Sequence, residues 1–284
     1  MHARRITILV ALILAAVAST PFAKAQASRV APQRGYQFVD VRTQGPFEVQ
    51  RWVAAAVPDV SPAGMCDCLI VVYEGKRRVV TLGRAGDLTA ITIDPVSGRD
   101  INGDRSPDLV VSSWSGGAHC CYETTVYSVG GDIRKVLSLA TGNCGPGTFE
   151  DLDGDKVLEF STCDDQWADT YCDFASAPFP TVVFRYDPGS RKYQVATPRF
   201  ARALQQLIDG ELASTRTALV GDGGKDPGVA KCLVLQPALD LMYTGRLGEG
   251  VALIRGLYRG GDLETFVEHV TSQTRSSPLW KAAP

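Results

Sequence analysis

The chain has 284 residues, of which 45% are hydrophobic and 21% charged, and its formal net charge at pH 7 is −2. This length is enough for one large domain or two modest ones with a real core. Nucleic-acid binding needs clustered Lys and Arg, so this mildly acidic composition argues against a nucleic-acid partner.

The first 25 residues have the pattern of a secretory signal. Arg4 and Arg5 form a basic start, residues 6–17 are apolar, and Ala23-Lys24-Ala25 is a small-x-small cleavage site. The apolar stretch is too short to span a bilayer core of about 30 Å at 1.5 Å per residue. We therefore expect residues 1–25 to be a signal peptide. The mature protein would be secreted or periplasmic, with no transmembrane segment after cleavage.

From residue 36 to residue 197 the pattern is β almost throughout. Short runs of apolar and β-branched residues are separated by Gly and Pro turns, with no helical period between them. The expected strands are residues 69–73, 78–82, 90–93, 124–129, 136–139, 181–186 and 192–195. This pattern favours an antiparallel architecture over a βαβ one, and we expect residues 26–197 to form a β-rich domain.

After Pro198 the hydrophobic period becomes helical. The expected helices are residues 200–208, 238–243, 251–258 and 263–270, with glycine breaks between the last three. Residues 198–284 are therefore expected to form a small C-terminal α-helical region, which Cys232 would tie to the β part. The predicted fold class is mainly β, with antiparallel, blade-like sheets and this helical region.

All eight cysteines follow the signal sequence, and an even count in an exported chain predicts disulfides. Zinc is a weaker reading, because neither Cys66-Asp67-Cys68 nor Cys120-Cys121 has the spacing that lets neighbouring ligands face one ion. Cys66 and Cys68 would share one face of a strand, so each is expected to pair elsewhere. Cys120 and Cys121 would point to opposite faces for the same reason.

Two acidic loops, 51 residues apart, carry the strongest chemical signal. Each has carboxylate or amide oxygens at positions 1, 3, 5 and 9, and then runs into an apolar strand. The expected metal ligands are Asp100, Asn102, Asp104 and Asp108 in the first loop, and Asp151, Asp153, Asp155 and Glu159 in the second. Calcium prefers six to eight oxygen ligands and tolerates irregular geometry, so we expect about two structural Ca²⁺ sites. The alternative is that these residues only solvate tight turns, which Asp and Asn favour.

The pattern Asp-x-Asn-Gly-Asp-x-x-x-Asp followed by Leu-Val-Val resembles the calcium loops of FG-GAP and VCBS-type repeats. The resemblance covers about residues 90–165, and it implies loops that join strands of β-propeller blades in secreted or cell-surface proteins. The family usually has Gly at position 6, where the backbone is left-handed, whereas this chain has Arg105 and Lys156. A non-glycine residue there costs roughly 1 kcal/mol. The β part has room for about three blades and a closed propeller typically needs four, so we expect an open or partial arrangement.

A serine hydrolase is the first enzymatic alternative. Ser113-Trp114-Ser115-Gly116-Gly117 approaches a nucleophile elbow, with Ser115 as the nucleophile and His269 as the base. An elbow needs a helix directly after the serine, and the sequence that follows is typical of a strand instead. The mature chain has only two histidines, His119 and His269, which excludes a metal site with three.

An acidic, aromatic loop at residues 163–173 offers a second alternative. A Cys163–Cys172 bond would close it, although spacing does not determine connectivity. Trp167 and Tyr171 would suit carbohydrate stacking, and Asp164 with Asp165 could act as paired acids for glycoside hydrolysis. The competing reading is a surface loop with its aromatic side chains folded inward.

The sequence favours a non-enzymatic function and assigns no catalytic residue. We expect a disulfide-stabilised, calcium-binding module that is secreted or associated with the envelope. Its ligand would be a protein or a glycan, contacted around residues 112–122 and 163–173. A secreted hydrolase, using Ser115 with His269 or acids near Asp164 and Asp165, is the alternative.

Overall fold

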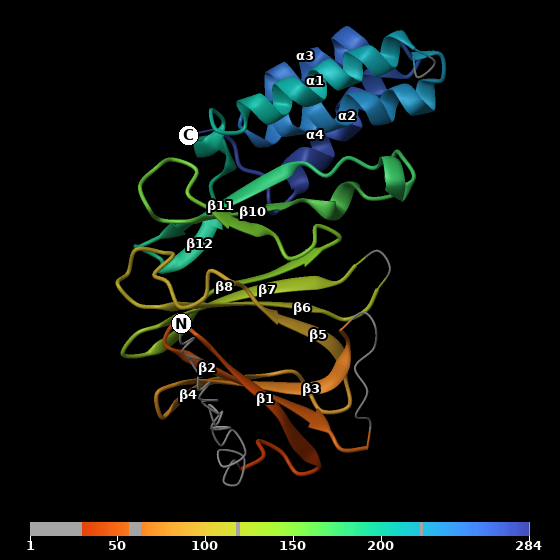
Figure 1. The fold of residues 1–284 in the computed structure, drawn as a ribbon. Coiled ribbons are helices and arrows are strands. Elements are labelled where there is room, and N and C mark those ends of the chain that lie inside the picture. Colours follow the sequence, from red (N-terminus) through yellow and green to blue (C-terminus); the bar gives the residue numbers. More distant parts are fainter. Residues whose placement is uncertain (1–29, 57–63, 118–119, 222–223, 284) are drawn as a thin grey trace, which may run out of the picture.

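The computed structural model describes residues 30–56, 64–117, 120–221 and 224–283. The expected signal peptide, residues 1–25, lies outside these ranges. In these ranges, twelve strands come first and four α-helices follow. Figure 1 shows the strands as successive layers below the helices.

The strands form three antiparallel meanders of four strands each. The first contains β1 (Tyr36–Gln44), β2 (Phe47–Ala54), β3 (Cys66–Glu74) and β4 (Arg77–Leu82). The second contains β5 (Leu88–Ile93), β6 (Asp108–Trp114), β7 (Tyr122–Val129) and β8 (Ile133–Gly142). The third contains β9 (Thr148–Glu150), β10 (Glu159–Cys163), β11 (Thr181–Asp187) and β12 (Lys192–Val195). In the second and third meanders, an acidic loop joins the first strand to the second.

The meanders are linked but do not form a ring. A short pairing of Cys66 and Asp67 with Thr89 and Leu88 merges the first two into one eight-stranded sheet, and the third is a separate four-stranded sheet. The prediction of a mainly β, antiparallel fold with a C-terminal helical region is therefore confirmed. No closed barrel or propeller occurs among the described residues.

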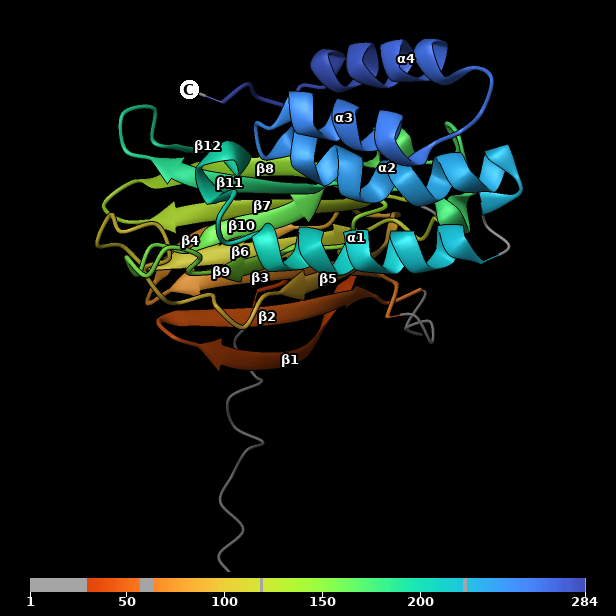
Figure 2. The same ribbon diagram turned by 90° about the horizontal axis from the view of Figure 1, so that it is seen from above.

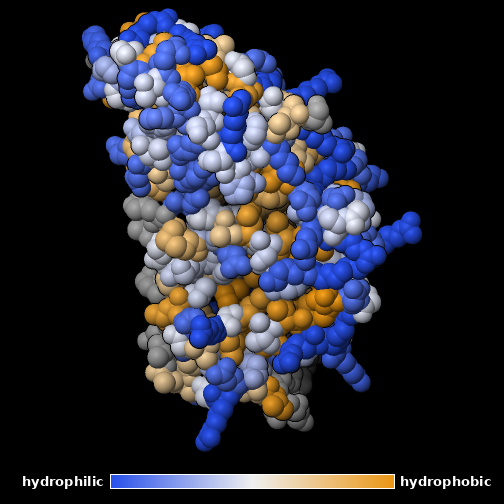
Figure 3. Space-filling model, turned by 180° about the vertical axis from the view of Figure 1, so that it is seen from behind, coloured by the Kyte–Doolittle hydropathy of each residue, from blue (hydrophilic) through white to orange (hydrophobic). Residues whose placement is uncertain are grey.

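Strand β6 is apolar on both faces because it separates two cores. Val110 packs into a core shared with the third meander and the helices, which includes Val126 and Phe160. Leu109 and Val111 face the opposite way, into a core shared with the first meander. This explains why residues 109–111 read as a continuous apolar run rather than as an alternating one. Seen from behind, hydrophobic side chains also reach the surface at the level of the sheets (Figure 3).

The helical region follows a short 3-10 turn at Thr197–Phe200. It contains α1 (Gln205–Val220), α2 (Pro227–Tyr243), α3 (Leu247–Leu257) and α4 (Leu263–Ser276). In the view from above, α2 and α3 lie between α1 and α4 (Figure 2). Helix α2 begins earlier than predicted, because Asp226 caps it through the N–H groups of Gly228 and Val229 and Pro227 occupies its first position. None of the helices in the described ranges is long and apolar enough to cross a membrane.

The helical region packs on the third meander through α2. Leu235 and Leu239 of α2 are fully buried and belong to the same core as Val182 and Phe184 of β11. A disulfide between Cys172 and Cys232 adds a covalent link, as expected for Cys232. The helices and the third meander therefore share one hydrophobic core.

All eight cysteines are paired, and the remaining three bonds are Cys66–Cys68, Cys120–Cys121 and Cys144–Cys163. Three sequence-based expectations about these cysteines were wrong. Cys66 and Cys68 do share a strand face, but their Cα atoms lie 5.1 Å apart and the two side chains bond to each other. Cys120 and Cys121 also pair with each other: they precede β7, so the alternation of a strand does not apply to them. Cys163 and Cys172 each bond to a different partner, so the suggested Cys163–Cys172 bond is absent.

Candidate functional site

The two acidic loops have the same backbone geometry. In the first, the carboxylate of Asp100 accepts hydrogen bonds from the N–H groups of Gly103 and Arg105, both at 2.8 Å. In the second, the carboxylate of Asp151 accepts from Gly154 at 2.7 Å and Lys156 at 2.9 Å. Position 1 therefore organises each turn by binding the N–H groups of positions 4 and 6.

The carboxylate at position 9 of each loop accepts a hydrogen bond from the backbone at position 2. Asp108 accepts the N–H of Ile101 at 2.8 Å, and Glu159 accepts the N–H of Leu152 at 2.9 Å. Both side chains are completely buried. Burial raises the pKa of Asp108 to about 8, and the nearby Asp104 carboxylate acts in the same direction. Burial also raises the pKa of Glu159.

Arg105 and Lys156 occupy the left-handed positions that the resemblance assigns to glycine. Their φ angles are 68° and 75°, so the strained position 6 is present in both loops. Both side chains are exposed, and neither forms an ion pair with a loop carboxylate among the described residues. These two residues accept the backbone strain of the loop without neutralising its charge.

Arg185 of β11 is the cation of the second loop. The β10–β11 register pairs Phe160 with Phe184, which places Arg185 beside Glu159. Its guanidinium lies 2.5 Å from Glu159 Oε1 and 3.1 Å from Asp153 Oδ2, and also pairs with Asp155. Arg199 makes a further pair with Asp153 at 3.0 Å. Sequence reasoning missed Arg185, because only the strand register brings it to the loop.

The carboxylates of the first loop have different hydrogen-bond partners. The side-chain amide of Asn102 donates to Asp108 Oδ1 at 2.9 Å, and the Ser128 hydroxyl donates to Asp104 Oδ2 at 2.6 Å. Arg134 of β8 lies 3.4 Å from Asp104. This loop therefore has a single arginine contact at 3.4 Å, whereas the second loop has four shorter ones, three from Arg185 and one from Arg199.

The loops meet at the junction of the second and third meanders. The Leu158 N–H donates to the Ile101 carbonyl at 2.7 Å, and both side chains enter the core that the two meanders share. A Cβ atom at Gly103 would lie 3.0 Å from Val157 Cγ2, so the second loop packs directly against the turn of the first. The two acidic loops are therefore in direct contact with each other.

The carboxylates of the second loop suit a divalent cation that prefers oxygen. Asp151, Asp153 and Glu159 each offer an oxygen, and these atoms lie within 4.8 Å of one another. Such a set fits Ca²⁺, but Asp153 and Glu159 also hold Arg185, which an ion would have to displace. Among the described residues of the first loop, no three Asp or Glu side chains converge in this way. Of the eight expected ligands, the structure brings three together around one point.

Ser115 and His269 do not form a catalytic pair in the described structure. Ser115 is exposed at the end of β6, and the next element is β7 rather than the helix that an elbow requires. His269 is exposed on α4, and no hydrogen bond joins it to Ser115. His119 lies outside the described residues.

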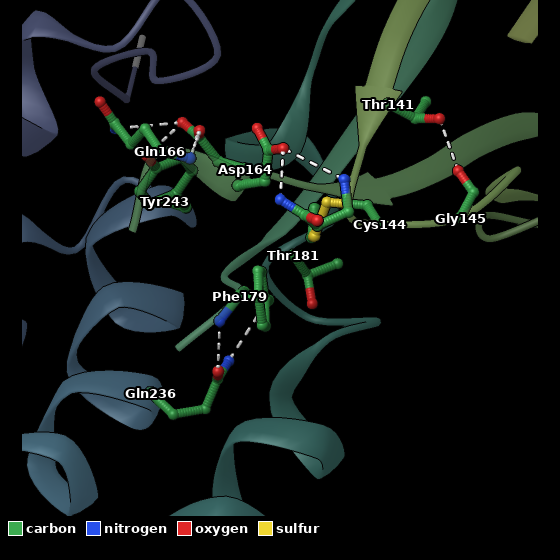
Figure 4. The surroundings of a disulfide bond; sticks show 12 residues. Thr141, Cys144, Gly145, Asp164, Gln166, Phe179, Thr181, Gln236 and Tyr243 are labelled. Carbon is green, nitrogen blue, oxygen red and sulfur yellow. Dashed lines mark hydrogen bonds between the residues drawn. A yellow bond between two sulfur atoms is a disulfide. The ribbon is translucent and has the colours of Figure 1, made fainter. Parts of the chain in front are cut away.

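Asp164 is a buried structural acceptor rather than an exposed acid. Its Oδ2 accepts from the hydroxyl of Tyr243 at 2.6 Å and from Gln166 Nε2 (Figure 4). It also accepts from the Ser277 hydroxyl. Two of these partners belong to the helical region, so Asp164 joins the third meander to α2 and to the segment after α4. Asp165 is engaged separately, by the backbone and side-chain N–H groups of Asn143 at 3.1 Å.

The aromatic side chains of residues 163–173 point inward. Trp167 is completely buried and donates its Nε1 hydrogen to the Tyr243 hydroxyl at 3.2 Å. Tyr171 packs edge-on against Phe266 of α4. Burial of Trp167 supports the inward-folded alternative for that ring, whereas Tyr171 is half-buried and lines a cleft with Asp173 and Val229.

Two neighbouring carboxyl groups, those of Glu211 and Asp240, lie between α1 and α2. Asp240 of α2 is 2% exposed and accepts from the Thr181 N–H at 2.8 Å and from Gln236 Nε2 at 2.5 Å. Gln236 also bridges to the backbone of Phe179 (Figure 4). Glu211 of α1 lies beside Asp240, and burial together with that neighbouring carboxyl group raises the pKa of Glu211 to about 8. Burial raises the pKa of Asp240 as well, so both carboxyl groups of this pair are harder to ionise than usual.

Comparisons with known proteins assign no activity. No protein-family model matches the chain, and no solved structure matches it. The uncharacterized protein y4bJ of Sinorhizobium fredii is 26% identical over 131 residues, which is 40% of this chain and 20% of that protein. The chain thus spans about a fifth of the length of this relative, whose name gives no function.

Proposed function

We propose that the protein is a secreted or periplasmic, disulfide-stabilised binding module whose two acidic loops hold structural Ca²⁺ ions. One observation carries the proposal: the same hydrogen bonds, from positions 2, 4 and 6 to the carboxylates of positions 1 and 9, occur in both loops. Two loops at the same place in two meanders favour a shared ligand set over two unrelated turns.

The meanders are, in this proposal, blades of a partial propeller of the FG-GAP and VCBS type. Each has four antiparallel strands, the number found in a propeller blade. Each acidic loop joins the first two strands of its meander, as the resemblance implies. Three blades cannot close a ring, and the helices cover the third meander instead.

Asp151, Asp153 and Glu159 would hold the ion in the second loop, and Asp100, Asn102, Asp104 and Asp108 in the first. The ion supplies positive charge to these oxygens. Arg185 competes for the second site, because its guanidinium already pairs with Asp153 and Glu159. The first loop has only the weaker Arg134 contact to displace, although Asn102 must turn its amide oxygen inward.

The module acts by binding rather than by catalysis. Its ligand is a protein or a glycan, contacted from the side of residues 112–122, of which 118 and 119 lie outside the described residues. Within residues 163–173, burial of Trp167 and the hydrogen bonds of Asp164 argue against these two side chains as ligand contacts. They also argue against the paired-acid hydrolase.

Calcium titration of the mature chain, residues 26–284, tests the proposal. Calorimetry should detect about two bound ions, and the melting temperature should be higher in excess calcium than in chelator. Saturation at a hundredfold excess over Kd stabilises by about 2.7 kcal/mol. Asp100→Asn with Asp151→Asn should abolish the heat, while Asp87→Asn, an exposed control outside both loops, should not. The absence of both heat and thermal shift in the wild type would reject calcium binding.

A further inference from the structure

A cleft of about 280 Å³ lies along β5, β6 and β7 of the second meander. It is separate from the loop carboxylates and from the Asp164 network. Its lining includes Ala90, Thr92, Asp94, Ser112, Trp114 and Tyr122. The cleft thus coincides with the described part of the surface to which we assign the ligand.

One wall of the cleft is aromatic. Trp114 pairs with Tyr122 across β6 and β7, and their rings are stacked, with an interplanar angle of 15° and centroids 5.9 Å apart. The indole Nε1 donates to the carbonyls of Gly117 and Cys120 at 3.1 and 2.9 Å, which fixes the ring and uses its only donor. The neighbour of Trp114 on β5 is Ala90, whose methyl group leaves room against the indole. Trp114 therefore offers an oriented apolar face.

The next row of the sheet carries hydroxyl groups. Thr92, Ser112 and Thr124 are cross-strand neighbours on β5, β6 and β7. The Thr124 hydroxyl donates to the Pro146 carbonyl at 2.8 Å, and Ser112 Oγ lies 3.0 Å from Thr124 Oγ1. A carbonyl only accepts, so Thr124 has given its hydrogen to Pro146 and Ser112 must donate to Thr124. Ser112 is left as an acceptor at the cleft.

Asp94 adds a second acceptor at the end of β5. Its Oδ1 accepts the N–H of Val96 at 2.8 Å, and no other hydrogen bond to this carboxylate occurs among the described residues. The cleft therefore combines an apolar wall with two acceptors. A ligand that matches it has one flat apolar face and several hydroxyl donors on its edge.

We propose that this cleft binds one pyranose ring of a glycan, with the ring against Trp114 and hydroxyl groups donating to Ser112 and Asp94. The volume lies just below the roughly 300–1,000 Å³ of pockets for drug-sized ligands, which suits a single ring. A hydroxyl row beside the indole favours a neutral polyol over an organic cation, which would use Trp114 and Asp94 alone. This inference rests on the proposed binding function and gives it a ligand class and a site.

Saturation-transfer NMR on the mature chain tests the site. The probes are the free methyl glycosides of glucose, galactose, mannose and N-acetylglucosamine, with tetramethylammonium as the cationic rival. At least one glycoside should bind the wild type. Trp114→Ala should weaken that binding at least tenfold, and Ser112→Ala severalfold. Trp114→Phe should retain it, and so should the control Leu88→Ala, which alters an exposed residue of β5 outside the cleft.

Circular dichroism melting establishes that each variant is folded. If Trp114→Ala does not fold, Ser112→Ala still decides the test. The proposal is overturned if no glycoside binds the wild type. It is equally overturned if Ser112→Ala and a folded Trp114 variant without a ring bind as the wild type does, or if only tetramethylammonium binds. Each titration is made in calcium and in chelator. Sugar binding without any calcium heat would reject the calcium sites alone, and calcium heat without sugar binding would reject the cleft alone.

Discussion

Replacing Arg185 with Met removes the arginine that makes three of the four ion pairs of the second acidic loop, while retaining an extended side chain. Glu159, whose side chain is 0% exposed, would keep only the Leu152 N–H as a donor. It would also remain beside the carboxylates of Asp153 and Asp155, of which Asp155 would lose its arginine and Asp153 would keep only Arg199. We therefore expect a clear loss of stability in chelator.

The magnitude follows from burial. Removing one partner of a buried ion pair destabilises a protein by about 3–5 kcal/mol. The Arg185 side chain is 16% exposed and two of its three carboxylate partners are partly exposed, so we expect the lower end, about 3 kcal/mol. At roughly 2–4 °C per kcal/mol for a chain of this size class, the melting temperature should fall by about 6–12 °C.

Calcium should rescue this variant more than it helps the wild type. Without the guanidinium, Asp151, Asp153 and Glu159 remain as three carboxylates within 4.8 Å. The assay is urea denaturation and melting, in chelator and in excess calcium. The control is Arg202→Met, an exposed arginine with no ion pair among the described residues, which should change stability by less than about 0.5 kcal/mol. If Arg185→Met is as stable as the wild type in chelator, or gains nothing from calcium, the account of this loop is wrong.

Three further predictions concern stability. The pKa of Glu211 is raised from 4.5 to about 8 in the folded state, so the folded protein holds one more proton than the unfolded protein between these pH values. The free energy of unfolding should therefore fall as the pH rises from about 4.5 to 8, by at most about 1.4 kcal/mol per pH unit. In urea titrations, Glu211→Gln should flatten this slope. Asp164→Ala should leave the hydroxyls of Tyr243 and Ser277 without their acceptor. Urea denaturation should then show a free energy of unfolding lower by about 3 kcal/mol. An equal effect of Asp87→Ala, at an exposed position, would show that the loss is not specific. Gly103→Ala should lower the melting temperature more than Gly154→Ala. Both glycines have positive φ, but only at Gly103 would the new Cβ meet a side chain, Val157 Cγ2 at 3.0 Å. Equal losses in the two variants would contradict the packing of the two loops.

The local chemistry of this fold could be predicted from the sequence. Residues 69–73 and 78–82 form the expected hairpin as part of β3 and β4, with Gly75 left-handed in the turn. The acidic loops also lie where expected, directly before strands β6 and β10. In each case, the deciding residues are close together in sequence, so turn chemistry and strand alternation are enough.

Contacts that depend on register could not be predicted in this way. Arg185 lies 26 residues from Glu159, and only the pairing of β10 with β11 brings the two together. The predicted helix at residues 238–243 covers only the end of α2, in which Pro227 occupies the first turn and Pro237 is buried within the helix. Disulfide partners depend on the assembled fold for the same reason, and Cys172 pairs across 60 residues.

The pairing of consecutive strands in every meander has a consequence for folding kinetics. Contacts between neighbours in sequence close small loops and form quickly, so each meander can assemble before the chain that follows it is in place. The contacts that need distant residues are concentrated at the helical end: the Ser277 hydroxyl reaches Asp164 across 113 residues, and Gln273 reaches Gln166 across 107. We therefore expect the sheets to form in N- to C-terminal order and the helices to dock in the final, slowest step.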